Sequence, residues 1–186
     1  MPTVERNLPT TGYVVLGLLS FDRELTGYEC KQWADGSLRF FFSSPAMSQI
    51  YDELERLQRY GYVRSRDDSG GSDRSRRAFR ITAAGRTALR RWVDRENVGA
   101  PVLKHSVALR IFLGHLADPA RLDALLGEHA ARTEAMLEDL DEVRADLEGD
   151  DTRKYAAIVA EWGCRFYEGD LDATRAAQSK LRELAP

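Results

Sequence analysis

The apolar positions in the first quarter of the chain recur at helical spacing. Apolar residues fill most of 11–21, which predicts a largely buried helix. Thr26 with Glu29 three residues later forms a capping-box pattern, so a second helix is expected over 27–36, with Gly36 at its end. Two helices are therefore predicted before residue 37.

A third, amphipathic helix is predicted from Ser44 to about Gly61. Ser44 is a favoured N-cap residue, and Pro45 suits the first helical position. Apolar residues then recur at steps of four and three, which places one stripe against the core. The stripe consists of Ile50, Leu54 and Leu57.

After this helix the period changes to that of a β-hairpin. Residues 62–66 and 74–82 are predicted strands, joined by the Gly- and Asp-rich turn 67–73, and 83–96 is a predicted helix. The aromatic segment 37–43 fits either a strand or a loop. Its aromatic residues, expected to pack in the core, are Phe40, Phe41 and Phe42.

The second half of the chain is predicted to be all helical. Residues 102–118 form one expected helix, closed at Asp118 and Pro119. Beyond them, apolar positions alternate in steps of four and three, which is a heptad seam. A helix of about 30 residues would be about 45 Å long, too long to be buried by a small domain alone. Its seam comprises Leu122, Leu126, His129, Met136, Leu140, Val143 and Leu147.

A further helix after the break at 148–152 can fold back on the seam. It carries apolar residues at helical spacing, among them Tyr155, Ile158, Trp162 and Phe166. We expect these helices to form a homodimerisation module in which Trp162 and the seam residues take part. The alternative is a hairpin within one chain and no dimer.

Charge divides the chain into the same two parts. Residues 1–97 contain 16 Lys and Arg against 13 Asp and Glu, a net charge of +3, whereas 98–186 contain 11 against 17, a net charge of −6. Opposite signs suggest two functions. We therefore expect two domains, 1–97 and 98–186, with polyanion binding in the first.

The predicted order in residues 10–97 is that of a winged helix-turn-helix with a two-stranded wing, which makes the fold mainly α. In such a domain the third helix enters the major groove of double-stranded DNA by its N-terminal part. That part of the helix carries no acid, whereas Asp52, Glu53 and Glu55 lie further along and would repel DNA. The residues expected at the DNA are Ser44, Met47, Ser48, Gln49 and Tyr51.

The wing is rich in arginine. Eight arginines and one acid, Asp94, lie between Arg74 and Arg95. Arg74, Arg76 and Arg77 flank the turn and are expected to neutralise phosphates. A solvated charged hairpin is the alternative.

The sequence resembles the PadR family of bacterial transcriptional regulators over about half its length. The stretches that carry the resemblance are "VLGLLSFDRELTGYE", "QIYDELERLQRYGYV" and "RRAFRITAAGRTALRRW". The resemblance implies a winged helix-turn-helix joined to an all-helical dimerisation domain. One departure is Ser48, where many members of the family have glycine.

Other chemistry finds little support in the sequence. His105, His115 and His129 have no i,i+3 or i,i+4 spacing from one another, so no metal site is expected, and no cofactor motif is present. Cys30 and Cys164 are isolated and expected to be reduced thiols. With no secretory signal and no long apolar run, the chain is predicted to be cytoplasmic and to have no membrane partner.

The best-supported function is a homodimeric, sequence-specific DNA-binding regulator on a two-fold symmetric operator. Family resemblance favours repression, relieved by a small-molecule effector. The alternative is a winged-helix module that binds protein and does not bind DNA specifically. An enzyme would need a constellation of catalytic residues that the motifs do not supply.

Overall fold

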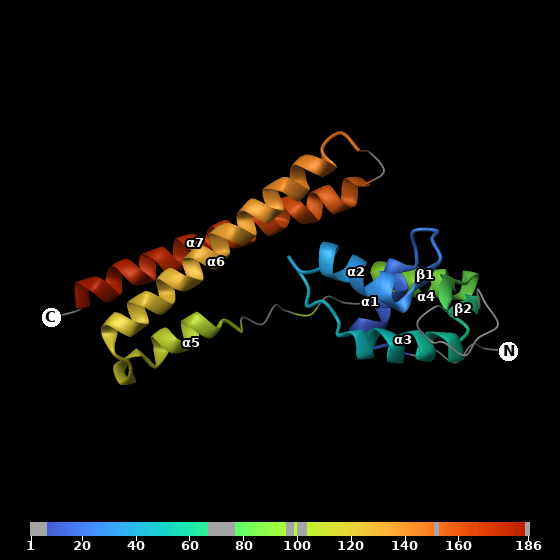
Figure 1. Cartoon of the computed structure of the whole chain (residues 1–186), viewed down its shortest axis with the longest axis horizontal. Coiled ribbons are helices and arrows are strands. Elements are labelled where there is room, and N and C mark those ends of the chain that lie inside the picture. Colours follow the sequence, from blue (N-terminus) through green and yellow to red (C-terminus); the bar gives the residue numbers. More distant parts are fainter. Residues whose placement is uncertain (1–6, 67–76, 96–98, 100–103, 151–152, 185–186) are drawn as a thin grey trace. The chain divides into compact units, whose positions relative to one another are not determined.

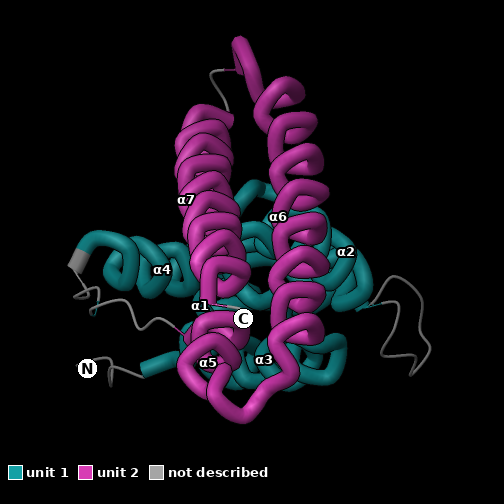
Figure 2. Tube along the Cα trace, turned by 90° about the vertical axis from the view of Figure 1, so that its left-hand side faces the viewer, with its two compact units in different colours: residues 1–99 teal, residues 100–186 magenta. Residues whose placement is uncertain are grey.

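The structure, a computed structural model, describes residues 7–66, 77–95, 99, 104–150 and 153–184. It divides into two compact units, residues 1–99 and 100–186 (Figure 2). The first unit contains α1 (Thr10–Leu18), β1 (Leu25–Thr26), α2 (Gly27–Ser37), α3 (Met47–Arg59), β2 (Val63–Arg66), β3 (Ala78–Ile81) and α4 (Ala83–Arg95). The second contains α5 (Ser106–Phe112), the 3-10 turn η2 (Gly114–Leu116), α6 (Pro119–Leu147) and α7 (Lys154–Leu184) (Figure 1).

The core of the first unit lies where α1, α3 and the sheet meet. Leu16 of α1 and the three stripe residues Ile50, Leu54 and Leu57 of α3 are fully buried. Burying a leucine or isoleucine side chain stabilises a fold by roughly 1.5–3 kcal/mol, so this stripe alone fixes which side of α3 faces inward. The opposite side of α3 remains available to a ligand.

The sheet has one strand more than the sequence predicts. In the described residues its order is β1-β3-β2, all antiparallel. The extra strand, β1, pairs Leu25 with Phe79 and Thr26 with Ala78. Because β1 is only two residues long, it shows no period-two pattern. The predicted two-stranded wing is thus confirmed as β2 and β3, and β1 extends it to a three-stranded sheet.

The helix α2 is capped as predicted, whereas α3 is not. The Thr26 side chain accepts a hydrogen bond from the Glu29 backbone N–H, and the Glu29 carboxylate accepts one from the Thr26 backbone N–H. The helix α3 begins at Met47, two residues later than Pro45, with Ala46 as its N-cap. Gln49 Oε1 accepts from the Ala46 backbone N–H at 2.9 Å.

Ser44, the predicted N-cap of α3, instead joins a polar cluster with α2. Its hydroxyl donates to Asp35 Oδ1 at 2.6 Å and accepts from Lys31 Nζ at 3.3 Å. Bonds from Lys31 and Ser44 lower the pKa of Asp35, Lys31 contributing most. Ser44 thus holds the segment between α2 and α3 and is not the N-cap that was predicted, whereas its predicted contact with DNA stays a prediction.

The aromatic segment before α3 is a turn, not a strand. Phe40 is buried, as expected, and the Arg39 guanidinium lies 4.5 Å from the centre of its ring. Phe41 and Phe42 are exposed. The prediction that all three pack in the core is wrong for those two, because a tight turn directs consecutive side chains to different sides.

The second unit is a long antiparallel helical hairpin with a short helix at one end. The helices α6 and α7 lie side by side, and α5 packs at the end opposite their connection (Figures 1 and 2). Asp118 caps α6 by accepting from the Arg121 backbone N–H at 2.8 Å, and Pro119 is its first residue. The helix expected over 102–118 is shorter than predicted, because it ends at Phe112 and η2 follows.

The heptad seam of α6 is covered within the chain. Leu122 and Leu126 pack with Val107, Ile111, Ala177 and Leu181, and Leu140 lies against Gly163 of α7. Met136 and Val143 are half-buried, and His129 bonds to Asp170 of α7. The residues Leu122, Leu126, Leu140 and Leu147 are therefore buried within a single chain, and their place in a dimer interface stays a prediction.

No helix in the described ranges has the length and apolar character needed to cross a bilayer.

Candidate nucleic-acid interface

The N-terminal turn of α3 presents two small polar side chains. Ser48 and Gln49 are exposed, and the turn contains no acid. The hydrogen bond from the Ala46 backbone N–H to Gln49 Oε1 fixes the orientation of the Gln49 side-chain amide at the start of the helix. Its NH₂ group is then the part that can donate to a base or phosphate acceptor. Met47, half-buried, lies beside them.

Tyr51 has a packing role in this interface. A Cβ on Gly27 would lie 2.5 Å from Tyr51 Cε1, so the ring covers the N-terminus of α2 at close range. The half-buried Tyr51 therefore sets the spacing between α2 and α3. A glycine at position 27 is what permits that close approach.

Glu53, one of the three acids in the middle of α3 that were expected to repel DNA, is buried and does not face outward. The Glu53 side chain is only 6% exposed, and a Cβ added at Gly12 of α1 would lie 2.9 Å from its Oε2 atom. Its Oε1 accepts from Arg56 Nη1 at 3.1 Å, while Oε2 has no hydrogen-bond partner among the described residues. Burial raises the pKa of the Glu53 carboxyl despite the opposing effect of Arg56.

This carboxyl makes the stability of the first unit depend on pH. A folded-state pKa above the usual value of 4.5 means that Glu53 favours folding at low pH and that this contribution is lost as the pH rises through the folded-state pKa. We expect Glu53→Gln to remove that loss, so that the variant gains thermal stability relative to the wild type as the pH rises from 4 to 8. The exposed Asp52→Asn variant is the control. Parallel curves of Tm against pH for wild type and Glu53→Gln would contradict the prediction.

A hollow beside the C-terminal half of α3 carries two arginines. It is lined by Glu55, Gln58, Arg59 and Arg77. Arg77 directly precedes β3, so this hollow joins α3 to the base of the wing. Of the predicted wing arginines, Arg74 and Arg76 lie outside the described residues.

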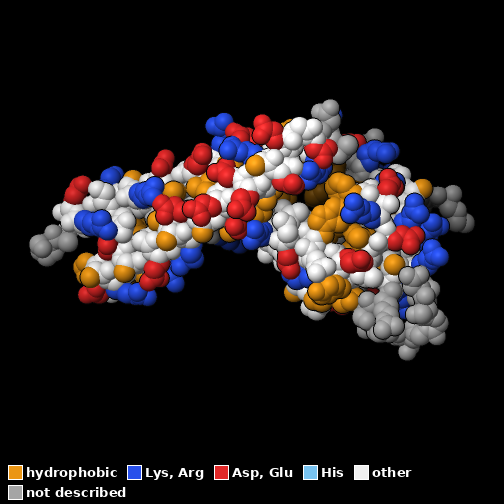
Figure 3. All heavy atoms as spheres, turned by 45° about the horizontal axis from the view of Figure 1, so that its top comes forward, with side chains coloured by type: hydrophobic (Ala, Val, Ile, Leu, Met, Phe, Trp, Pro, Cys, Tyr) orange, Lys and Arg blue, Asp and Glu red, His pale blue; other side chains and the backbone are white. Residues whose placement is uncertain are grey.

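A second hollow of about 360 Å³ lies on the sheet and was missed by sequence reasoning. Arg64, Arg66 and Arg80 line it, together with Glu24, whose carboxylate lies 3.9 Å from Arg80. Strand pairing explains the arrangement, since Arg64 is directly opposite Arg80 and Arg66 lies two residues further along the same face. Figure 3 shows lysine and arginine side chains gathered at this end of the first unit. The alternating arginines of "VRSR" were the available signal.

The second unit exposes two apolar patches at opposite ends of its hairpin. The α7 patch consists of Tyr155, Ile158, Trp162 and Phe166, which recur at helical spacing near the α6–α7 connection and are at least half exposed. Trp162 and Phe166 are stacked with ring centres 5.6 Å apart. The α5 patch consists of Leu109, Phe112, Leu113 and Leu116. Among the predicted interface residues, Trp162 is thus the one on an exposed apolar surface.

Comparison with known proteins identifies the first unit. A family model described as the transcriptional regulator PadR-like family matches residues 15–91. The first unit belongs to the PadR-like family of transcriptional regulators. Residues 103–182 of the second unit match a model described as the virulence activator alpha C-terminal domain. A curated relative, the negative transcriptional regulator PadR of Bacillus subtilis, is 27% identical over 128 residues, 69% of each chain.

Solved structures of PadR-like proteins share the fold of the whole chain. Bacillus subtilis PadR in complex with operator DNA has a TM-score of 0.80 at 21% identity, covering 93% of this chain and 99% of that one. The same protein in complex with p-coumaric acid has a TM-score of 0.75 at 20% identity, covering 94% and 99%. The Vibrio cholerae virulence activator AphA has a TM-score of 0.74 at 18% identity, also covering 94% and 99%.

These matches confirm the PadR resemblance, the mainly helical winged fold and a role in transcriptional regulation. The family consists of regulators and not of enzymes.

Proposed function

We propose that this PadR-like chain represses transcription as a homodimer that binds a two-fold symmetric operator, from which a small-molecule effector releases it. The observation that carries the DNA-binding part is the pairing of an acid-free α3 start with arginines on the adjoining strands. Ser48 and Gln49 offer groups that can read bases, and Arg59, Arg64 and Arg66 offer charges for the flanking phosphates.

A titration tests this directly. The protein is titrated into DNA from upstream of its own gene and followed by fluorescence anisotropy at two salt concentrations, with a scrambled duplex as competitor. We expect binding that survives the competitor and weakens with salt. Equal binding to the scrambled duplex would oppose operator recognition and favour a winged unit that binds protein.

The wing supplies a sharper prediction. The double variant Arg76→Ala/Arg77→Ala should weaken binding to operator and random DNA alike. Each lost phosphate contact should reduce the magnitude of the slope of log K against log salt by about 0.9. The homodimer loses two contacts per chain, four in all, so the magnitude of the slope should fall by about 3.6. Arg121→Ala, which changes an exposed arginine of α6, is the matched control. An unchanged slope in the double variant would remove the wing from the mechanism.

Gln49→Ala should behave differently from the wing variant. Losing a base-reading amide costs roughly 1–3 kcal/mol on operator DNA and little on random DNA. The same variant also removes the bond to the Ala46 backbone N–H, so circular dichroism should accompany the titration. Equal losses on both DNAs would restrict Gln49 to holding the start of α3.

The homodimer is inferred from the two apolar patches of the second unit. A two-fold interface is self-complementary, so a patch on one copy must meet a patch on the other. The α7 and α5 patches lie at opposite ends of the hairpin, and two antiparallel copies can therefore bring each α7 patch against the partner's α5 patch. Large exposed apolar patches are rare on monomers and mark interaction surfaces.

Release by an effector follows by similarity to a PadR protein solved with p-coumaric acid. An effector acts by binding more tightly to a conformation in which the two winged units no longer match the operator. The measurement is the same anisotropy titration with and without an aromatic acid.

A further inference from the structure

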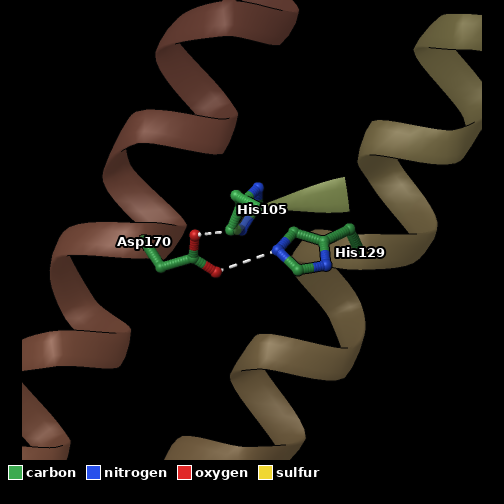
Figure 4. A group of neighbouring side chains, drawn as sticks. All are labelled: His105, His129 and Asp170. Carbon is green, nitrogen blue, oxygen red and sulfur yellow. Dashed lines mark hydrogen bonds and ion pairs between the residues drawn. The ribbon is translucent and has the colours of Figure 1, made fainter. Parts of the chain in front are cut away.

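Three side chains with metal-binding atoms converge in the second unit, although they are far apart in sequence. His105 is the N-cap of α5, His129 lies on α6 and Asp170 on α7 (Figure 4). His105 Nε2 lies 2.9 Å from Asp170 Oδ1, and His129 Nε2 lies 2.9 Å from Asp170 Oδ2. One ligand atom from each residue lies within 4.8 Å of the other two.

The cluster is supported by its surroundings and is still reached by solvent. The Thr133 hydroxyl, buried on α6, lies 3.3 Å from Asp170 Oδ2 and so helps to orient the carboxylate. The two imidazole rings meet edge to face with centres 5.1 Å apart. The three side chains are each between 16% and 23% exposed, which leaves an entry path for a small ion.

We propose that His105, His129 and Asp170 bind one divalent transition-metal ion of the zinc class. Two imidazole nitrogens and one carboxylate oxygen are borderline ligands that suit zinc, and a water molecule would complete a tetrahedron. Magnesium and calcium are disfavoured, because they prefer sites made of oxygen atoms. Asp170 sits between the two histidines, so a single ion can contact all three residues.

Binding has a defined consequence for the imidazole hydrogens. In the structure His105 Nδ1 accepts from the Ala108 backbone N–H at 3.2 Å, which places the ring hydrogen on Nε2. A metal ion bound at Nε2 requires that hydrogen to move to Nδ1. The bond from Ala108 is then given up, and the first turn of α5 loses its cap. Ion binding therefore couples directly to the start of α5, which follows soon after the junction of the two units in the sequence.

The test uses the untagged full chain, treated with chelator and dialysed against Zn²⁺. We expect one Zn²⁺ per chain by elemental analysis, and visible absorption typical of a tetrahedral N/O site when Co²⁺ is added. His129→Gln and Asp170→Asn each remove a proposed ligand and should weaken Zn²⁺ binding by roughly 100-fold or more. Removing a residue that only hydrogen-bonds to a ligand costs less, about 10- to 100-fold. His115→Gln, which changes the histidine of η2, is the control and should bind as the wild type does.

Two further measurements guard against a variant that fails to fold. Thr133→Val removes only the supporting hydroxyl and should weaken Zn²⁺ binding about 10- to 100-fold. In the wild type the backbone amide signal of Ala108 should shift on Zn²⁺ addition. Binding that is equally strong in all variants, or an absence of stoichiometric Zn²⁺ in the folded wild type, would overturn the proposal. None of these readouts depends on DNA binding, so they can succeed or fail independently of the proposed repressor function.

Discussion

Replacing Ile158 and Trp162 together by aspartate is expected to convert the proposed dimer into a folded monomer. Both side chains are exposed in the single chain, Ile158 by 64% and Trp162 by 56%, so aspartate meets water there and not the core. In a dimer the same positions would bury two uncompensated charges per copy, which is strongly unfavourable. Sedimentation equilibrium gives the mass of the wild type and the variant at equal concentration.

The same variant should lose operator affinity by roughly 10²–10⁴-fold, because two tethered winged units bind two half-sites far more tightly than one unit binds a single half-site. Val93→Asp provides a matched control. Val93 is also an exposed apolar residue on a helix, at 67%, but it belongs to α4 of the first unit. A dimeric Ile158→Asp/Trp162→Asp variant, or a monomeric wild type, would contradict the assignment of the α7 patch.

The contrast between Trp162 and Leu126 shows what sequence reasoning reached and what it could not. Periodicity correctly placed Leu126 on an apolar face of a long helix, and the length of that helix correctly implied a partner. It could not identify the partner, since α7 of the same chain and α6 of a second chain would satisfy the same pattern. Leu126 is fully buried inside the hairpin, which leaves Trp162 on the outside.

In the first unit, local signals carried most of the prediction. The Thr26–Glu29 cap and the Ile50, Leu54 and Leu57 stripe depend on residues within one or two helical turns, and both are present in the structure. The burial of Glu53 depends instead on Gly12 of α1, 41 positions earlier in the chain. The helical spacing places Glu53 on the same face as Ile50 and Leu57, but a charged side chain on that face gave no reason to expect burial.

The His105, His129 and Asp170 cluster was invisible for the same physical reason. Metal motifs are recognised from sequence when two ligands share a helix or a turn. Here each ligand comes from a different helix or its cap, and the packing of α5 on the hairpin brings them together.

Gly85→Ala should strongly destabilise the first unit, by about 3 kcal/mol or more, because overpacking against backbone cannot relax easily. A Cβ at position 85 would lie 2.2 Å from the backbone oxygen of Tyr62 and 2.9 Å from Ile81 Cγ1. The Tyr62 oxygen is itself held by hydrogen bonds from the Thr82 backbone N–H at 2.9 Å and from the Thr82 hydroxyl at 3.1 Å. The start of α4 is thereby fixed against the start of β2, and neither side can move away alone.

Helix propensity predicts the opposite sign, and this makes the experiment decisive. Alanine stabilises an exposed helix by about 1 kcal/mol relative to glycine. A Cβ added at Gly36 of α2 would meet no atom of the described residues within 4 Å, so Gly36→Ala should gain stability and is the matched control. Urea unfolding of both variants measures the difference. If Gly85→Ala were as stable as Gly36→Ala, the close contact between α4 and β2 could not be what joins the wing to the helices. A large loss of stability at position 85 alone would show that this contact holds the arginine-bearing strands beside α3.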